Sequence, residues 1–220
     1  MSSDPLDIRI QTIDTQHAVS ALWKYIAVME AQMEEVRRCE RVALEAERPQ
    51  IADEEEHQIF WSRENTLEEL FEQDLTPAMR YSFVVLMHTV FETRLRAFCS
   101  DIQTERSIPI ALKEVRGSAI DQACTYLTKL AAIPAGKLPE WQHLRTFQKV
   151  RDCVVHAYGY VAELSDEKKQ REIRALVDQN IGVAIDDYGR LALTKAFCEQ
   201  HLTHMGGFFD TLFREVGWMK

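Results

Sequence analysis

Residues 138–159 read LPEWQHLRTFQKVRDCVVHAYG, and this stretch decides which fold the sequence predicts. Its apolar residues recur three, four and seven positions apart, the spacing of one face of an α-helix. Pro139 suits a first helical turn, and Gly159 suits a helix end. Arg151 lies in the middle of the apolar face, whose other members are Leu144, Phe147, Val154, Val155 and Tyr158. The stretch therefore predicts a helix over 139–158 with one cation on its apolar side.

The remainder of the chain shows the same helical periodicity. Its 220 residues include only eight glycines and six prolines, which favours long helices over strands and turns. Asp14, Thr76 and Thr194 are the expected N-caps, and Pro77 suits the first turn after Thr76. The passage IGVAIDDYGRLALT has a glycine between two apolar runs, which predicts a β-hairpin. Further helices are expected over 14–47, 51–73, 77–105, 118–132, 165–178 and 194–215.

The predicted fold is mostly α: an antiparallel helical bundle with a small β-hairpin near 182–193 and a long N-terminal helical extension. We expect an acidic extension over 1–76 and a helical domain over 77–220, packed together as one unit. The chain carries a net charge of −9, and residues 1–76 hold 7 basic and 18 acidic residues. The overall acidity argues against a general nucleic-acid binder. The second region is nearly neutral and has a local basic group of His143, Arg145, Lys149 and Arg151.

Other features of the sequence indicate the compartment. The N-terminus lacks the basic and apolar regions of a signal peptide, and the most apolar stretch, residues 81–91, is too short to span a bilayer. Five cysteines are odd in number and widely scattered, which does not indicate a disulfide framework. We therefore expect a soluble, cytoplasmic protein with no membrane partner.

Arg151 raises a chemical question, because a guanidinium keeps its charge even where it is buried. An unpaired cation away from water costs several kcal/mol. Arg151 therefore needs an acidic partner, an opening to solvent or a bound anion, and its planar donors suit phosphate. All three solutions remain open from the sequence.

The neighbours of Arg151 favour a catalytic interpretation. Asp152 and His156 are four positions apart, which allows a carboxylate–imidazole hydrogen bond on one helix face. That bond would fix the histidine tautomer and raise the histidine pKa. Together with the Tyr158 hydroxyl, these groups provide a proton shuttle and a cation, as phosphodiester cleavage without a metal requires. The alternative is that Arg151 and His156 are satisfied core groups or dimer contacts.

The segment RDCVVH resembles the signature of the HEPN superfamily: arginine, usually followed by Asn or Asp, and histidine after four to six intervening residues. Tyr158 extends it to R-x4-H-x-Y, which resembles the HEPN toxins paired with a small nucleotidyltransferase antitoxin. The resemblance covers residues 77–215 in architecture. Glu92, in the helix expected over 77–105, is similar to the acid that the first HEPN helix often carries.

The resemblance implies a HEPN-like bundle and a metal-independent endoribonuclease without a cofactor, of the toxin or antiphage-defence kind. It implies a homodimer in which two motifs face each other and cleave RNA. Arg151 would stabilise the scissile phosphate, His156 would handle protons at the 2′-hydroxyl and the leaving oxygen, and Asp152 would orient His156. Tyr158, Glu92 and Lys149 are supporting candidates, and an antitoxin such as a small nucleotidyltransferase is a possible partner.

Two alternatives to the nuclease remain. One is a non-catalytic HEPN-like dimer that serves as an interaction or RNA-binding protein. The other is a toxin regulated by nucleotidylation of Tyr158. A zinc site is not expected: Cys198, His201 and His204 drift around their helix and no fourth ligand is evident, so a packed cysteine and exposed histidines are expected. Glu92 is expected to pair with Arg151 or with Arg96.

Overall fold

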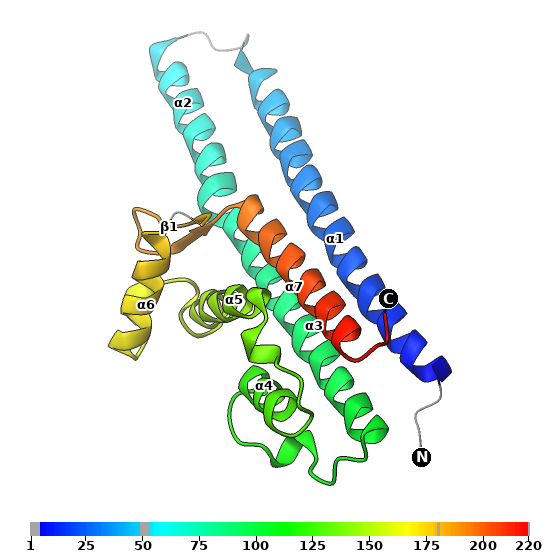
Figure 1. Ribbon diagram of the computed structural model, residues 1–220. Helices are drawn as coiled ribbons and strands as arrows, with labels where there is room; N and C mark the ends of the chain where they lie inside the picture. Colours follow the sequence, from blue (N-terminus) through cyan, green and yellow to red (C-terminus); the bar gives the residue numbers. More distant parts are fainter. Residues whose placement is uncertain (1–4, 49–52, 180, 220) are drawn as a thin grey trace.

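The computed structural model describes residues 5–48, 53–179 and 181–219, and it is mostly α-helical (Figure 1). The mostly α-helical character, the long N-terminal helix and the small antiparallel hairpin near the C-terminus are confirmed. No helix in the described ranges is long and apolar enough to cross a membrane. The elements are α1 (Pro5–Glu45), α2 (Glu54–Glu69), η2 (Leu70–Leu75), α3 (Thr76–Glu105), η3 (Leu112–Glu114), α4 (Ala119–Lys129), η4 (Ala135–Lys137), α5 (Pro139–Ala157), η5 (Val161–Glu163), α6 (Glu167–Val177), β1 (Val183–Ile185), β2 (Leu191–Leu193) and α7 (Lys195–Glu215).

Helices α1 and α2 form a hairpin that extends beyond the rest of the protein (Figure 1). The prediction that a helix begins at Asp14 is wrong: α1 starts at Pro5, and Asp14 lies inside it. The predicted start of the second helix at residue 51 lies outside the described residues. Helix α2 begins at Glu54, where the Asp53 carboxylate accepts a hydrogen bond from the Glu56 N–H at 2.9 Å. Three glutamates in its first turn suit the positive end of the helix dipole.

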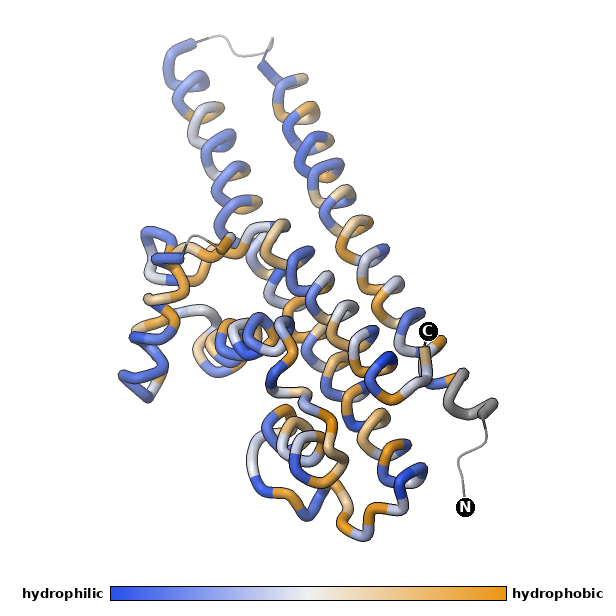
Figure 2. The backbone as a smooth tube through the Cα atoms, in the orientation of Figure 1, coloured by the Kyte–Doolittle hydropathy of each residue, from blue (hydrophilic) through white to orange (hydrophobic). Residues whose placement is uncertain are grey.

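Ion pairs hold much of this hairpin together. Arg37 and Arg41 on α1 both pair with Glu68 on α2, and Arg63 on α2 pairs with Glu47 just beyond the end of α1. Figure 2 shows mainly hydrophilic residues at the far end of α1 and α2, whereas hydrophobic residues gather where α3, α5 and α7 meet. The acidic extension therefore contributes little apolar burial at its tip, where Arg37, Arg41 and Arg63 are engaged by its own carboxylates.

The predicted helix over 77–105 matches α3, but the predicted cap at Thr76 is wrong: no side chain caps α3, and the backbone stays helical from Glu54 to Glu105. Pro77 is in the first turn of α3, as predicted. In a regular α-helix the N–H of residue 77 would donate to the Gln73 carbonyl, but proline has no N–H. The chain widens into the π-helix η2, where the Thr76 N–H reaches the Phe71 carbonyl. The Arg190 Nη2 donates to the Gln73 carbonyl at 2.8 Å, so the β-hairpin supplies a donor there.

The core lies along α3, which packs against α1, α5 and α7. Phe91 on α3 makes edge-on contacts with Phe208 and Phe209 on α7. Further along, Phe98 meets Phe213 and the C-terminal Trp218. Thr194 caps α7 by accepting from the Phe197 N–H at 3.1 Å, which confirms that predicted cap. These aromatic contacts join α3 to α7 along much of their length.

The C-terminal end of α5 is held between α3 and the β-hairpin. The helix ends with Tyr158 in the left-handed region and Gly159 at a φ of 83°. A Cβ at Gly159 would lie 2.1 Å from the Tyr81 hydroxyl oxygen, so only glycine fits there. The Leu191 N–H donates to the Gly159 carbonyl at 3.0 Å, and the Tyr81 hydroxyl donates to the Leu191 carbonyl. The predicted hairpin is confirmed, with Ala184 opposite Ala192.

Candidate functional site

Arg151 lies where the apolar face of α5 leaves the core. Leu144 and Phe147, in the first part of that face, are buried. Val155 and Tyr158, in the last part, are 47% and 57% exposed. The Arg151 side chain between them is 24% exposed. Val154, beyond Arg151, is buried as well, so the apolar face is exposed only at Val155 and Tyr158, and the cation is partly open to solvent.

Arg151 uses few of its hydrogen-bond donors. Its Nη1 donates to the Asp152 Oδ1 at 2.8 Å, and this is its one hydrogen bond within the described residues. Its Nε is buried and has no partner. A guanidinium has five N–H donors. Arg151 therefore has an adjacent carboxylate that balances its charge, and it keeps donors free for another acceptor.

His156 is in the last turn of α5, and its side chain is exposed. The expected hydrogen bond between Asp152 and His156 is not formed, because the Asp152 carboxylate is turned to Arg151 instead. In the described part of the chain His156 forms no hydrogen bond or ion pair. Five positions along a helix amount to a rotation of about 140°, so Arg151 and His156 point to different sides of α5. A single chain does not bring these two groups together.

His88 on α3 belongs to the Arg151 site but was missed in the sequence. Its side chain is 1% exposed, its ring stacks on Phe147, and both ring nitrogens lack a hydrogen bond. Burial and, next, the positive charge of Arg151 lower the pKa of His88 to about 4, whereas Asp152 acts in the opposite direction. His88 is therefore neutral at pH 7 and lies close enough to feel both charges. His88 follows Val84 by four residues and precedes Phe91 by three, and this helical spacing was the sign in the sequence that His88 lies on the buried face of its helix.

Glu92 lies one turn beyond His88, and its Oε1 is 3.6 Å from the His88 Nδ1. That distance is too long for a hydrogen bond. The expected ion pair of Glu92 with Arg151 or Arg96 is not found among the described residues. Glu92 is thus near the Arg151 site without neutralising its cation.

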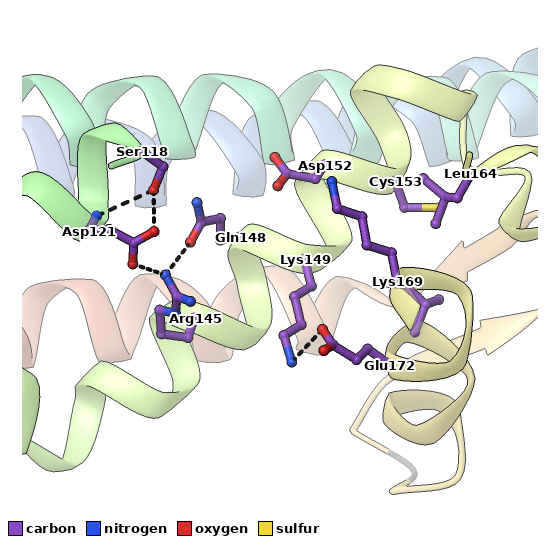
Figure 3. A pocket seen from close by; sticks show the side chains of 11 residues that line it. Ser118, Asp121, Arg145, Gln148, Lys149, Asp152, Cys153, Leu164, Lys169 and Glu172 are labelled. Carbon is purple, nitrogen blue, oxygen red and sulfur yellow. Dashed lines mark hydrogen bonds and ion pairs between the residues drawn. The ribbon is translucent and has the colours of Figure 1, made fainter. Parts of the chain in front are cut away.

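A cavity of about 260 Å³ between α4, α5 and α6 adjoins Asp152 (Figure 3). Arg145 and Lys149 line it from α5, and each pairs with an acid: Arg145 with Asp121, and Lys149 with Glu172 at 3.1 Å. Lys169 reaches in from α6 and points toward Asp152 (Figure 3). Within the described ranges Lys169 has no ion pair. Arg145 and Lys149 of the predicted basic group therefore do lie together, but the carboxylates of Asp121 and Glu172 balance their charges.

Tyr158 lies at the edge of a shallow apolar depression of about 660 Å³ on α3 and α5. Its ring meets the Tyr81 ring edge-on, with centroids 5.7 Å apart. Its hydroxyl has no hydrogen bond in the described structure. Leu86 on α3 and Val155 on α5 are exposed in the same depression. This surface continues the apolar face of α5 on which Arg151 lies.

The histidines of α7 differ from expectation. His201 is buried rather than exposed, and His204 is half-buried with its ring stacked on His143. Cys198 is buried, as expected for a packed cysteine. No group of three or more metal-binding side chains is found among the residues that the structure describes.

Comparison of the chain with protein-family models, with curated proteins and with solved structures finds no match.

Proposed function

We propose that this chain is a HEPN-like, metal-independent endoribonuclease of the toxin or antiphage-defence kind, acting as a homodimer. One observation carries the proposal. Within the motif RDCVVH, the guanidinium of Arg151 lies partly exposed on an apolar face, with its Nε unpartnered and a single hydrogen bond to Asp152. The donors of Arg151 that Asp152 does not occupy suit the oxygens of a phosphate.

The proposed chemistry is a transesterification. His156 accepts the proton of an RNA 2′-hydroxyl, whose oxygen attacks the adjacent phosphorus. The bond from phosphorus to the 5′-oxygen breaks, and that oxygen takes up a proton from a histidinium. Arg151 binds the non-bridging oxygens and stabilises the charge of the pentacoordinate transition state. The products are a 2′,3′-cyclic phosphate and a 5′-hydroxyl, and no metal ion is required.

The dimer explains how two diverging groups reach one phosphate. The depression of Leu86, Val155 and Tyr158 is an exposed apolar surface beside Arg151. A second copy packed on it around a twofold axis would bury this surface and bring the two α5 ends together. In that arrangement Arg151 of one copy and His156 of the other share a site. Asp152 then holds the guanidinium in place, in contrast to the role on His156 expected from the motif.

The cavity beside Asp152 supports an RNA substrate. Lys169, which has no ion pair with any described residue, adds its ammonium to the cations of Arg145 and Lys149. Phosphates of a strand that enters this cavity could displace Asp121 and Glu172 as their partners.

The proposal is tested by incubating the purified full chain with RNA in the presence of a chelator. We expect cleavage by the wild type and at least a hundredfold loss in Arg151→Ala and His156→Ala. Exposed Arg96→Ala and His57→Ala, matched in residue type, should retain activity. Expression of the wild type should arrest growth, and expression of the two site variants should not. Full cleavage by either site variant would refute the assignment.

A non-catalytic HEPN-like dimer is the second candidate, and the Arg151–Asp152 pair favours it, because the pair already balances the charge. In that case the wild type cuts no RNA, and Arg151→Ala lowers the melting temperature or dissociates the dimer.

Regulation by nucleotidylation is a third candidate, favoured by the exposed Tyr158 hydroxyl. A nucleotidyltransferase antitoxin would then add one or more AMP units to Tyr158. Mass spectrometry of the protein co-expressed with such an enzyme, compared with Tyr158→Phe, separates this candidate from the others.

A further inference from the structure

Most charged side chains of the cavity between α4, α5 and α6 are held by their neighbours. The Asp121 carboxylate accepts a hydrogen bond from the Ser118 hydroxyl at 2.6 Å and pairs with Arg145. On the opposite side, the Glu172 carboxylate pairs with Lys149 at 3.1 Å. A ligand that bound Arg145 or Lys149 would therefore have to compete with a carboxylate that is already in place.

Lys169 is the cation of this cavity that no carboxylate neutralises. It extends from the first turn of α6 toward Asp152 (Figure 3), and it has no ion pair with any residue that the structure describes. The Asp152 carboxylate is itself engaged, because Arg151 donates to its Oδ1 at 2.8 Å. The side chain of Lys169 is exposed, so its ammonium is accessible to a ligand.

The charges around the cavity leave one cation in surplus. Arg151 and the residues that line the cavity provide four cations and three carboxylates: Arg145, Lys149, Arg151 and Lys169 against Asp121, Asp152 and Glu172. Three of these cations are each paired with one of the carboxylates. Lys169 is the fourth, so it carries the positive charge that is left over. The cavity is therefore suited to an anion at Lys169.

Phosphate is the anion that fits this position best. Lysine binds phosphate as a compact charge on a flexible stem, and it does not need the fixed geometry of an arginine fork. Arg151 and Lys169 both approach the Asp152 carboxylate, so the two cations lie near each other. Two consecutive phosphates of one strand can therefore reach Arg151 and Lys169 together.

We propose that Lys169 binds the RNA phosphate next to the scissile one, an inference that rests on the proposed nuclease function and adds a substrate-binding residue to it. The cavity then favours a strand that continues beyond the cleavage position over a dinucleotide whose single phosphate is the scissile one. Lys169 takes no part in the bond changes. It therefore contributes equally to binding of the substrate and of the transition state.

The first test is fluorescence anisotropy with a labelled single-stranded RNA of mixed sequence. The full chain with His156→Ala is the parent protein, so that the strand stays intact. We expect Lys169→Met to weaken binding at least about threefold at low salt, and to reduce the slope of log K against log[salt] by about 0.7, which corresponds to one lost phosphate contact. Lys169→Arg keeps the charge and should bind as the parent does.

Lys129→Met is the matched control for this measurement. Lys129 is exposed in the last turn of α4, and it has no ion pair in the part of the chain that the structure describes. Its replacement removes the same charge at a distance from the cavity, so binding and salt slope should stay those of the parent. An equal effect of Lys129→Met and Lys169→Met, no effect of Lys169→Met, or no RNA binding by the parent would overturn the inference.

Cleavage kinetics of the chain with intact His156 test where Lys169 binds. For a longer strand, Lys169→Met should raise KM at least about threefold and leave kcat unchanged. For a dinucleoside monophosphate with the bases of a cleaved position, the same variant should change neither constant. A reduced kcat, or an equal loss with both substrates, would contradict a contact to the neighbouring phosphate.

The two proposals fail separately. Unchanged RNA binding in Lys169→Met, together with intact cleavage by the wild type, removes only the phosphate site at Lys169. A specific loss of RNA binding in Lys169→Met, in a protein whose wild type cuts no RNA, removes only the nuclease and leaves an RNA-binding cavity.

Discussion

The Arg151 Nη1 and the Asp152 Oδ1 are 2.8 Å apart, so a cation and the carboxylate that balances it are consecutive residues of one helix. Both side chains are about a quarter exposed. An ion pair this accessible adds about 1 kcal/mol or less to stability. Its significance in the proposed mechanism is that it fixes the direction of the guanidinium beside the apolar depression.

Asp152→Asn removes the negative charge while it keeps the shape of the side chain. Because the guanidinium loses its charged anchor, we expect kcat for RNA cleavage to fall at least tenfold. KM should not rise, since the loss of an acidic charge favours RNA binding. Steady-state kinetics with Asp187→Asn, an exposed turn residue, as the control measures both constants. A raised KM with unchanged kcat would contradict a positioning role.

Arg190→Met should lower the free energy of unfolding by about 2–3 kcal/mol, because Arg190 is buried, pairs with Asp186 and donates to the Gln73 carbonyl. Pro77→Ala supplies a backbone N–H for that carbonyl. The cost of Arg190→Met should therefore be smaller, by at least about 0.5 kcal/mol, in the Pro77→Ala background. Urea unfolding of the four proteins measures this coupling. Additive effects would show that Arg190 does not compensate for the proline.

Stability should depend on pH through His88 and His201, whose pKa values burial lowers to about 4. Well above the ordinary histidine pKa of about 6.5, both histidines are neutral in the folded and the unfolded chain. As pH falls toward 4, the two histidines bind protons in the unfolded chain but stay neutral in the folded chain, so the free energy of unfolding decreases. The slope should be about 1.4 kcal/mol per pH unit for each histidine.

The measurement for this pH dependence is chemical denaturation at several pH values. His88→Phe and His201→Phe should each flatten the slope, and exposed His57→Asn should leave it unchanged. A wild-type free energy of unfolding that stays constant from pH 6.5 to 4.5 would contradict the buried, neutral state of the two rings.

Much of the fold could be predicted from the sequence, because α3, α5 and α7 carry clear apolar periodicity and α7 has a good cap. The predicted break at Thr76 failed for a physical reason. Proline usually begins a helix, but here a π-helix and the distant Arg190 let the chain continue through it. No local pattern reveals a donor that arrives from another element.

The sequence pointed to Arg151 as a candidate residue, but it could not predict the geometry around it. The position of Arg151 on an apolar face was evident from spacing, and of the three solutions left open the structure shows an acidic partner and a partial opening to solvent. The four-residue interval between Asp152 and His156 permits a hydrogen bond without requiring it. In the structure the Asp152 carboxylate accepts from Arg151 instead. His88 was missed because a single histidine in an apolar helix gives no sign of what lies across from it.

Val155→Asp should abolish the proposed dimer, because it places a charge in the apolar depression that a second copy would cover. Sedimentation velocity at micromolar concentration should show dimers for the wild type and monomers for this variant. Val42→Asp, at an exposed valine on α1, is the matched control and should remain dimeric. A monomeric wild type would argue against a site built from two copies.

Complementation between two inactive variants tests the central claim most directly. Arg151→Ala and His156→Ala chains are mixed, allowed to exchange subunits and incubated with RNA under a chelator. If Arg151 of one copy works with His156 of the other, each mixed dimer has one intact site. Equal mixing should then restore about one quarter of wild-type cleavage, with 2′,3′-cyclic phosphate ends. A mixture as inactive as either variant alone, from an active wild type that exchanges subunits, would contradict the account.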